Sequence, residues 1–172
     1  MTLASRIKKI KALVVDVDGV LTDGKIIFDS AGKETKNFNV YDGFGLVFLK
    51  GAGFKTAIIT ARGSKTVALR AKDLNIDRTY QDAFPKLEAY KKFLKEFRLR
   101  DEQICFIADD LPDLQVLKRV GFAVSVSNGV DEIKRAAHYV TKKKGGGGAV
   151  RETIELILKA QGKWQGVLAR YE

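Results

Sequence analysis

The stretch Asp16-Val17-Asp18-Gly19-Val20-Leu21-Thr22 follows directly on residues 10–15, a largely apolar run of strand length. Such a run is typical of a central strand that is buried on both faces. It predicts two carboxylates at the carboxyl end of this strand, with a glycine that turns the chain. In open α/β sheets that edge is where ligands bind. Asp and Gly are also ordinary turn residues, so the stretch by itself is equally consistent with a simple turn.

Length and composition indicate one globular domain. The chain has 172 residues, of which 45% are hydrophobic, which suits an ordinary core. No run is long and apolar enough to span a membrane, and the first residues lack a signal-peptide pattern, so we expect a cytosolic protein. The single cysteine, Cys105, lies in an apolar run and is expected to be an inert core thiol.

The chain is basic, with 31 Lys and Arg against 21 Asp and Glu and a net charge of +10. Such a balance is typical of proteins that bind nucleic acid, anionic lipid or small anionic substrates. The lysines are spread along the chain, as in the pairs at 8–9 and 91–92. There is no zinc-finger spacing and no aromatic RNA-recognition signature. Solvated helix faces explain most of these lysines, and a positive field around a cleft for an anionic substrate is the functional alternative.

Strand-like and helix-like stretches alternate along the rest of the chain. Strands are expected at residues 54–59, 78–80, 104–108, 122–126 and 139–140. Helices are expected at residues 46–49, 64–74, 85–97, 114–120, 130–137 and 150–158. Residues 142–148 are basic and rich in glycine, which predicts a flexible loop. The alternation predicts a doubly wound, mostly parallel, Rossmann-like sheet with helices on both faces.

Two segments carry apolar residues without an evident partner in the same chain. Residues 24–38 are expected to form a β-hairpin around a glycine-containing turn, beside the two aspartates. This hairpin carries Ile26, Ile27 and Phe28, too many apolar residues for a free two-stranded arm. The tail at 162–172 carries Trp164, Val167, Leu168 and Tyr171. Together these side chains favour contact with another surface, or a tail folded back on its own domain.

Further polar residues follow the apolar strands, so potentially catalytic side chains are expected together at the carboxyl ends of these strands. Six residues are expected to meet there: Asp16, Thr60, Lys86, Asp109, Asp110 and Asp113. Two carboxylates ~4 Å apart repel by ~4 kcal/mol at an effective dielectric constant near ~20, so this cluster takes up protons or binds a cation. Oxygen ligands without His or Cys favour Mg²⁺ over zinc. The lone His138 is expected to be structural, since a triad or zinc site needs partners that the sequence lacks.

The order Asp-x-Asp-Gly, Thr, Lys and Asp-Asp-x-x-Asp resembles the haloacid dehalogenase superfamily of phosphotransferases. The resemblance covers nearly the whole chain. Residues 16–23, the hairpin, residues 41–45 and residues 60–62 are similar to the small capless phosphatases of sugar acids. One departure is Ala108, where these enzymes commonly carry glycine before the paired aspartates.

The resemblance implies catalytic roles that agree with the chemistry of the residues. Asp16 would be the nucleophile that forms an aspartyl-phosphate, and Asp18 would act first as general acid and then as general base. Mg²⁺ would be bound by Asp16, by the Asp18 backbone carbonyl and by Asp109. Asp110 and Asp113 would surround these ligands or hold Lys86.

The resemblance also implies how substrate is bound. Thr60 and Lys86 would donate to the phosphoryl oxygens. Arg62 would bind the substrate carboxylate, because guanidinium suits planar anions. Gly43 and Phe44 would also belong to the substrate site. The implied reaction is hydrolysis of a phosphorylated sugar acid such as 3-deoxy-D-manno-octulosonate 8-phosphate, in lipopolysaccharide precursor synthesis, by a homotetramer whose subunits share active sites.

Other functions stay open at this point. The substrate is alternatively another nonulosonate phosphate. A non-catalytic scaffold domain of the same fold is a second alternative, although a scaffold needs neither Asp16 nor Asp18. A receiver-type signalling domain has its paired acids after the first strand and its acceptor on a later one. The Asp-x-Asp spacing and the late Asp109-Asp110 pair favour the phosphatase, and a basic nucleic-acid binder is a more distant alternative.

Overall fold

The strand that precedes the Asp-x-Asp stretch, β1 (Ala12–Val15), lies inside a six-stranded sheet. The structure is a computed structural model that describes residues 2–172. The sheet order is β5-β4-β1-β6-β7-β8, and every neighbouring pair is parallel. The other strands are β4 (Lys55–Ile59), β5 (Arg78–Tyr80), β6 (Ile104–Ala108), β7 (Phe122–Ser125) and β8 (Tyr139–Val140).

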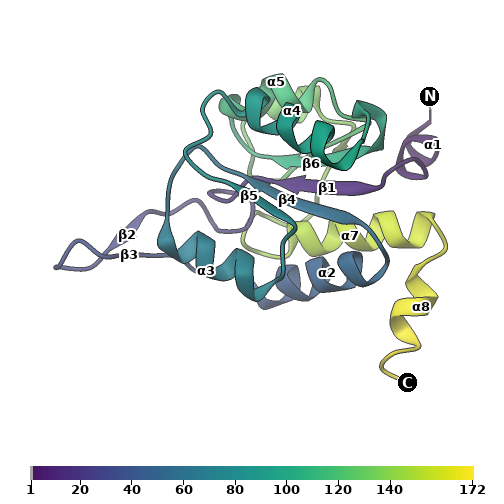
Figure 1. The fold of residues 1–172 in the computed structure, drawn as a ribbon, viewed down its shortest axis with the longest axis horizontal. Coiled ribbons are helices and arrows are strands. Elements are labelled where there is room, and N and C mark those ends of the chain that lie inside the picture. The colour runs from purple at the N-terminus through teal and green to yellow at the C-terminus, as the bar shows by residue number, and fades with distance from the viewer. Residues whose placement is uncertain (1) are drawn as a thin grey trace.

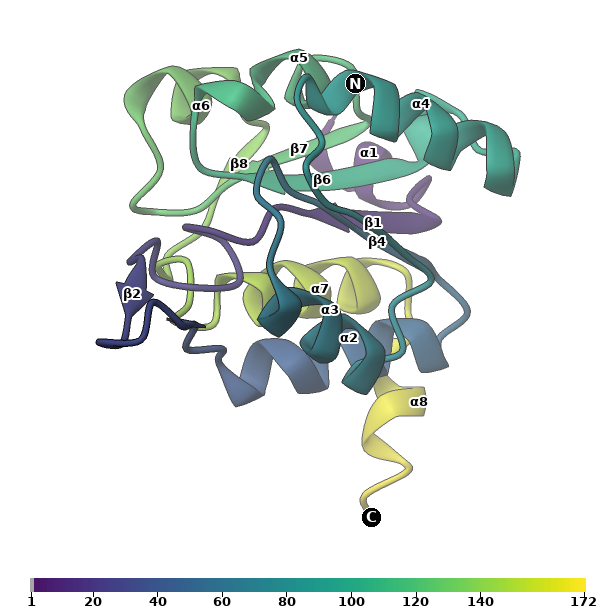
Figure 2. The same ribbon diagram turned by 60° about the vertical axis from the view of Figure 1, so that its left-hand side comes forward.

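Helices cover both faces of this sheet, as Figures 1 and 2 show. One face carries α2 (Val40–Gly51), α3 (Lys65–Asp73) and α7 (Ala149–Ala160). The other carries α4 (Lys86–Phe97), α5 (Leu114–Leu117) and α6 (Asp131–Ala136). Short 3-10 helices span Asp101–Gln103 and Leu111–Asp113. The predicted doubly wound parallel sheet is therefore confirmed.

No helix within residues 2–172 combines the length and apolar character needed to cross a membrane.

The core is divided by the sheet into two apolar clusters. Successive strand residues point to opposite faces. Leu13 and Val15 pack on the side of α2 and α7, whereas Ala12 and Val14 pack on the side of α4 and α5. Because both faces are covered, the strand is apolar at every position rather than at alternate ones. Cys105 is buried in the same core, and burial raises the pKa of its thiol, in agreement with an inert role.

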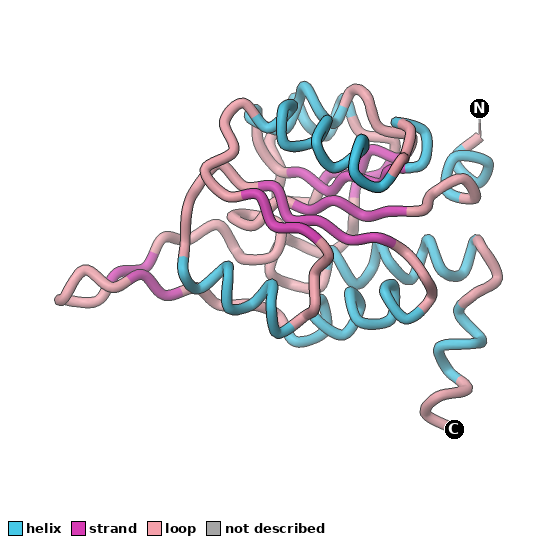
Figure 3. Tube along the Cα trace, in the orientation of Figure 1, coloured by secondary structure: helices cyan, strands magenta, loops and turns pink. Residues whose placement is uncertain are grey.

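The predicted hairpin consists of β2 (Ile27–Phe28) and β3 (Glu34–Thr35), paired antiparallel. Its turn is held by the Asp29 carboxylate, whose Oδ1 accepts hydrogen bonds from the backbone N–H groups of Ala31 and Lys33. The hairpin projects away from the sheet (Figures 1 and 3). Phe28 is 59% exposed at its outer end, so its apolar side chains have little cover within this chain.

Two elements at the ends of the chain complete the fold. The helix α1 (Leu3–Ile7) was not predicted, and it buries Ile7 against the core. The tail forms α8 (Trp164–Leu168), at the end of the molecule opposite the hairpin (Figure 1). The rings of Trp164 and Tyr171 lie with their centroids 6.2 and 5.7 Å from that of Phe48 on α2. The tail thus packs partly on its own domain, although Tyr171 is 67% exposed.

The start of α2 differs from the prediction, because residues 41–45 lie inside this helix and not before it. Asn39 caps the helix: its side-chain oxygen accepts from the backbone N–H of Tyr41. Gly45 is tolerated there since α7 approaches closely, and a Cβ at Gly45 would lie 3.1 Å from Arg151 Cδ. Tertiary packing therefore overrides the low helix propensity of glycine.

The glycine-rich loop at residues 142–148 is fixed by contacts, which corrects the expectation of a flexible loop. The backbone N–H of Gly146 donates to the Val20 carbonyl over 2.9 Å. The N–H of Gly145 donates to Asn128 Oδ1, and a Cβ at Gly145 would lie 1.7 Å from the Gly19 carbonyl oxygen. Glycine is needed here for close approach of two backbones. The loop therefore packs directly against the backbone of the turn that follows β1.

Candidate active site

The predicted site residues surround a cleft of about 270 Å³ at the carboxyl ends of β1, β4 and β6. The chain winds outward from β1 through β4 and β5, then returns to β6 on the other side of β1. The cleft therefore lies at the switch point where open α/β sheets bind ligands. Its lining is Asp16, Asp18, Gly24, Thr60, Ala61, Arg62, Lys86, Asp109, Asp110, Pro112 and Asp113.

Lys86 is the cation at the floor of this cleft. It is the first residue of α4 and is buried, with its Nζ 2.5 Å from Asp113 Oδ1 and 2.9 Å from Asp16 Oδ1. Burial alone would lower the pKa of Lys86, but the Asp16 and Asp113 carboxylates outweigh it and raise that pKa. Lys86 is therefore fully charged at neutral pH, and it joins the end of β1 to the segment after β6.

The turn after β1 brings a second carboxylate against the backbone of the Asp-x-Asp stretch. Gly19 has φ +86°, and a Cβ on it would lie 1.9 Å from Asp109 Oδ2. Glycine is required by both the backbone conformation and the lack of space. Asp109 itself lies at the end of β6, as the apolar strand before it predicted.

The carboxylates of the cleft hold protons more tightly than exposed carboxyl groups do. Burial raises the pKa of Asp16 to about 7, with the Asp113 charge acting in the same direction and Lys86 against it. Burial, followed by the charges of Asp16 and Asp113, raises the pKa of Asp109 to about 8. Burial also raises the pKa of Asp113, against the effect of Lys86. One ammonium is thus too little positive charge for three carboxylates.

The same carboxylates fit a divalent cation. Asp16, Asp109 and Asp113 each offer an oxygen, and these atoms lie within 4.8 Å of one another. Asp16 Oδ1 and Asp109 Oδ1 are buried without a hydrogen-bond partner; Lys86 Nζ lies near the former but not in hydrogen-bonding geometry. Asp113 Oδ1 contacts Lys86, and its Oδ2 accepts from the Asp109 N–H. Asp16 and Asp109, each with a buried oxygen that accepts no hydrogen bond, are therefore the better ligands, and oxygen ligands suit Mg²⁺.

These pKa shifts predict how stability depends on pH and metal. Between about pH 4 and pH 8 the folded, metal-free protein binds more protons than the unfolded chain, in which these carboxyls titrate near 3.8. Its stability should therefore fall as the pH rises through this window. Mg²⁺ needs the ionised carboxylates and should stabilise the protein more at pH 8 than at pH 5.

Thermal unfolding at the two pH values, with EDTA or with Mg²⁺, measures this effect. An Asp109→Asn variant is the control, because it removes one titrating group and one ligand and should reduce both trends. Equal stabilisation by Mg²⁺ at pH 5 and pH 8 would contradict the prediction.

Asp18 faces the hairpin, and its partner there was not predicted. Lys36 follows β3, and its buried Nζ lies 2.5 Å from Asp18 Oδ1 and 3.3 Å from Glu34 Oε1. Arg62 Nη2 lies 3.1 Å from the same Glu34 oxygen, and Arg62 Nε lies 3.7 Å from Asp18 Oδ2. The sequence did offer a signal for this partner. Side chains alternate between the two faces of a strand, so residues 34 and 36 of the returning strand lie on the same side of the hairpin.

Thr60 and Asp110 lie where the sequence predicted. Thr60 directly follows β4 and is buried, and its Oγ1 accepts a hydrogen bond from the Arg62 N–H. Asp110 is exposed at the cleft mouth and caps the following 3-10 helix through the Leu111 N–H. Ala108 is wholly buried in the cluster on the α4 side, so its methyl group lies away from the cleft lining.

Gly43 and Phe44 are not brought to this cleft. Gly43 faces α3, where a Cβ would lie 2.3 Å from Arg70 Nη2, and Phe44 is half-exposed with its ring 6.1 Å from that of Phe48. The neighbouring Asp42, which had no predicted role, is buried and accepts from the N–H groups of Gly148 and Arg151. These hydrogen bonds join the start of α7 to α2.

His138 has a structural contact, in agreement with the prediction. Its Nδ1 accepts a hydrogen bond from the Ala123 N–H over 2.9 Å. Burial lowers the pKa of the imidazole, and His138 is not among the residues that line the cleft.

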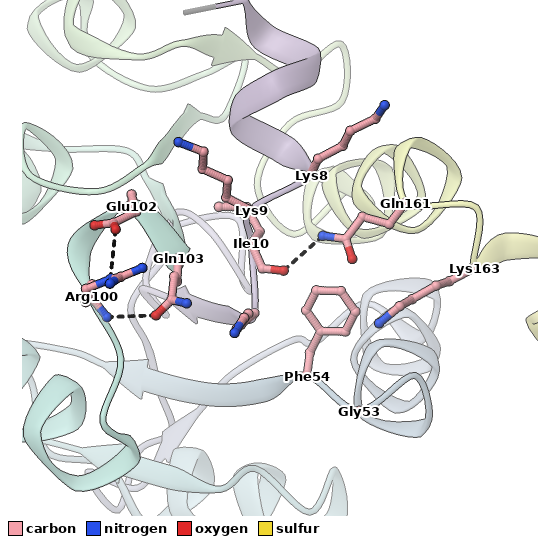
Figure 4. Close-up of a pocket in the computed structure, with 11 residues that line it drawn as sticks. Lys8, Lys9, Ile10, Gly53, Phe54, Arg100, Glu102, Gln103, Gln161 and Lys163 are labelled. Carbon is pink, nitrogen blue, oxygen red and sulfur yellow. Dashed lines mark hydrogen bonds and ion pairs between the residues drawn. The ribbon is translucent and has the colours of Figure 1, made fainter.

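A larger hollow of about 540 Å³ lies at the opposite, amino-terminal edge of the sheet (Figure 4). Its cations are Lys8, Lys9, Lys11, Arg100 and Lys163. The helices α2 and α7 end beside it, and cations offset the partial negative charge of helix C-termini. Lys163 Nζ accordingly donates to the Ala52 carbonyl, and Gln161 donates to those of Ile7 and Ile10. Among the residues that line this hollow the one carboxylate, Glu102, is paired with Arg100, so the smaller acidic cleft is the candidate active site.

Comparison with known proteins agrees with this site. A family model of haloacid dehalogenase-like hydrolases matches residues 57–154. The 3-deoxy-D-manno-octulosonate 8-phosphate phosphatase KdsC of Yersinia pestis is 44% identical over 161 residues, which cover 94% of this chain and 86% of the relative. KdsC of Escherichia coli strain K12 is 40% identical over 159 residues, covering 92% of this chain and 85% of the relative.

A solved structure extends the similarity to the whole fold. The 3-deoxy-D-manno-octulosonate 8-phosphate phosphatase of Moraxella catarrhalis, in complex with a magnesium ion, a phosphate ion and a KDO molecule, matches with a TM-score of 0.96 and 44% identity. The match covers 98% of this chain and 97% of that one. The chain therefore belongs to the haloacid dehalogenase-like hydrolases, in the family of the 3-deoxy-D-manno-octulosonate 8-phosphate phosphatases.

Proposed function

We propose that this protein hydrolyses 3-deoxy-D-manno-octulosonate 8-phosphate to the free sugar acid and phosphate, with Mg²⁺ as cofactor. The observation that carries the proposal is the buried Asp16–Lys86–Asp113 arrangement beside Asp109, at the end of the first strand. The similarity to the Yersinia pestis and Moraxella catarrhalis enzymes supports the substrate.

The residues of the cleft suit a two-step transfer. An Asp16 carboxylate oxygen attacks phosphorus, the bond from phosphorus to the sugar oxygen breaks, and Asp18 gives its proton to that oxygen. Water then attacks phosphorus, Asp18 takes a proton from the water, and the bond to Asp16 breaks to release phosphate. Thr60 and Lys86 donate to the phosphoryl oxygens in both steps. Bound Mg²⁺, held by Asp16, the Asp18 carbonyl and Asp109, would neutralise charge on the phosphoryl group.

A phosphate-release assay tests this function. Purified protein with Mg²⁺ should release phosphate from 3-deoxy-D-manno-octulosonate 8-phosphate with a higher kcat/KM than from other phosphorylated sugars and nonulosonates, and EDTA should stop the reaction. A higher kcat/KM on another nonulosonate phosphate would reassign the substrate. A stable phosphoryl-protein without turnover would favour a signalling domain, and no reaction with any substrate would favour a scaffold.

We further propose that the enzyme is a homotetramer in which tails approach neighbouring active sites. The exposed Phe28 and Tyr171 support this, since the hairpin and the tail lie at opposite ends of one chain and so cannot meet within it. A chain truncated after Gln161 should lose catalytic efficiency, and mixing it with full-length Asp16→Asn chains should restore part of the loss. A monomer by light scattering, or no recovery on mixing, would contradict the shared site.

A further inference from the structure

The Asp18 carboxylate belongs to a cluster of four charged side chains, which we call the hairpin cluster: Asp18, Glu34, Lys36 and Arg62. The Lys36 ammonium lies between the two carboxylates, 2.5 Å from Asp18 Oδ1 and 3.3 Å from Glu34 Oε1. Arg62 contacts the same two acids, with its Nε 3.7 Å from Asp18 Oδ2 and its Nη2 3.1 Å from Glu34 Oε1. Two acids and two cations make the cluster neutral, so each charge in it has a partner.

The two cations of the hairpin cluster differ in access to the cleft. The Lys36 side chain is 1% exposed and does not line the cleft, whereas the Arg62 side chain is 44% exposed and does. Arg62 also makes the longer contact to Asp18. A ligand can therefore reach Arg62, while Lys36 is separated from the cleft and its short contact to Asp18 is kept.

We propose that Lys36 is a positioning residue for Asp18. It fixes the Asp18 carboxylate at the edge of the cleft, and leaves Arg62 to bind the carboxylate of the substrate. The inference rests on the acid–base role proposed for Asp18. Proton transfer needs the carboxylate within about 3 Å of the reacting oxygen, and a displacement of ~1 Å costs ~10²-fold in rate. The hairpin then serves the chemical step.

Replacing Lys36 and replacing Arg62 should change different kinetic constants. On 3-deoxy-D-manno-octulosonate 8-phosphate, Lys36→Met should lower kcat by ~10²-fold with little change in KM, because the side chain does not touch substrate. Arg62→Ala should mainly raise KM. Lys33→Met, an exposed lysine on the same hairpin, is the matched control and should retain wild-type kcat and KM. Lys36→Arg should recover part of the lost kcat.

A double variant shows whether Lys36 acts through Asp18. Lys36→Met combined with Asp18→Asn should be no slower than Asp18→Asn alone, since the group that Lys36 positions is already gone. A further ~10²-fold loss in the double variant, or a wild-type kcat for Lys36→Met, would overturn the proposal. If Lys36→Met fails to fold, Lys36→Gln is measured by the same criteria. Absence of activity in the wild-type protein would refute the proposed function, which keeps the two outcomes distinct.

Discussion

Asp16→Asn should abolish turnover and leave the protein folded. The amide is not a nucleophile, so no covalent intermediate forms, and kcat should fall by about 10⁴-fold or more, the scale seen when a covalent nucleophile is removed. Folding should not suffer, because the change removes a buried carboxyl group. Burial and the Asp113 charge raise the pKa of this group to about 7, so its ionised form is unfavourable in the folded protein. At pH 8 without metal the variant should even melt a few degrees higher than the wild type. At pH 5, where Asp16 is protonated, this gain should vanish.

Steady-state kinetics and thermal unfolding measure both parts of this prediction. Asp131→Asn is the control, since the same chemical change is made on α6 at a side chain that is 78% exposed. Mass spectrometry of the variant excludes conversion of the asparagine back to aspartate. Turnover within ~10²-fold of the wild type would remove Asp16 from the nucleophile's role.

The sheet and the position of the cleft were predictable because their causes are local. The residues of β1 and β6 are apolar at every position, which is the pattern of strands covered on both faces. Asp16, Thr60 and Asp109 were placed together by one rule, that carboxyl ends of parallel strands share an edge. The structure keeps these three around one cleft.

The partners that were missed depend on how distant segments dock. Lys36 reaches Asp18 only because the chain that leaves the hairpin after β3 passes close to the turn after β1. Asp42 accepts from N–H groups more than a hundred residues away. Residues 142–148 have the composition of a flexible linker, yet Gly145 is required by the close backbone of Gly19, and Gly146 by that of Thr22 and Asp23. Neither propensity nor periodicity carries such information, because the requirement arises from tertiary contact.

Lys86→Met should cost both stability and activity, because Lys86 compensates two buried carboxylates. Within residues 2–172 it is the cation that lies within 4.0 Å of Asp16 and Asp113. Breaking a buried ion pair by removing one partner costs about 3–5 kcal/mol. The loss should be larger at pH 8 than at pH 5, because Asp16, with a pKa raised to about 7, is protonated at pH 5. Loss of one phosphoryl donor should lower kcat by ~10²–10³-fold. Lys91→Met, on the exposed side of the same helix, is the control and should show neither effect.

A second-site change separates the electrostatic role of Lys86 from its catalytic role. Asp113 directs Oδ1 to Lys86 and Oδ2 to the Asp109 N–H, so Asp113→Asn keeps the shape of the site and removes one of the uncompensated charges. Lys86→Met with Asp113→Asn should therefore regain much of the stability lost at pH 8. Its kcat should stay low, because no ammonium then faces the phosphoryl group. Activity that recovered together with stability would show that Lys86 serves only to hold the carboxylates in place, and Thr60 would then be the main phosphoryl donor from this part of the chain.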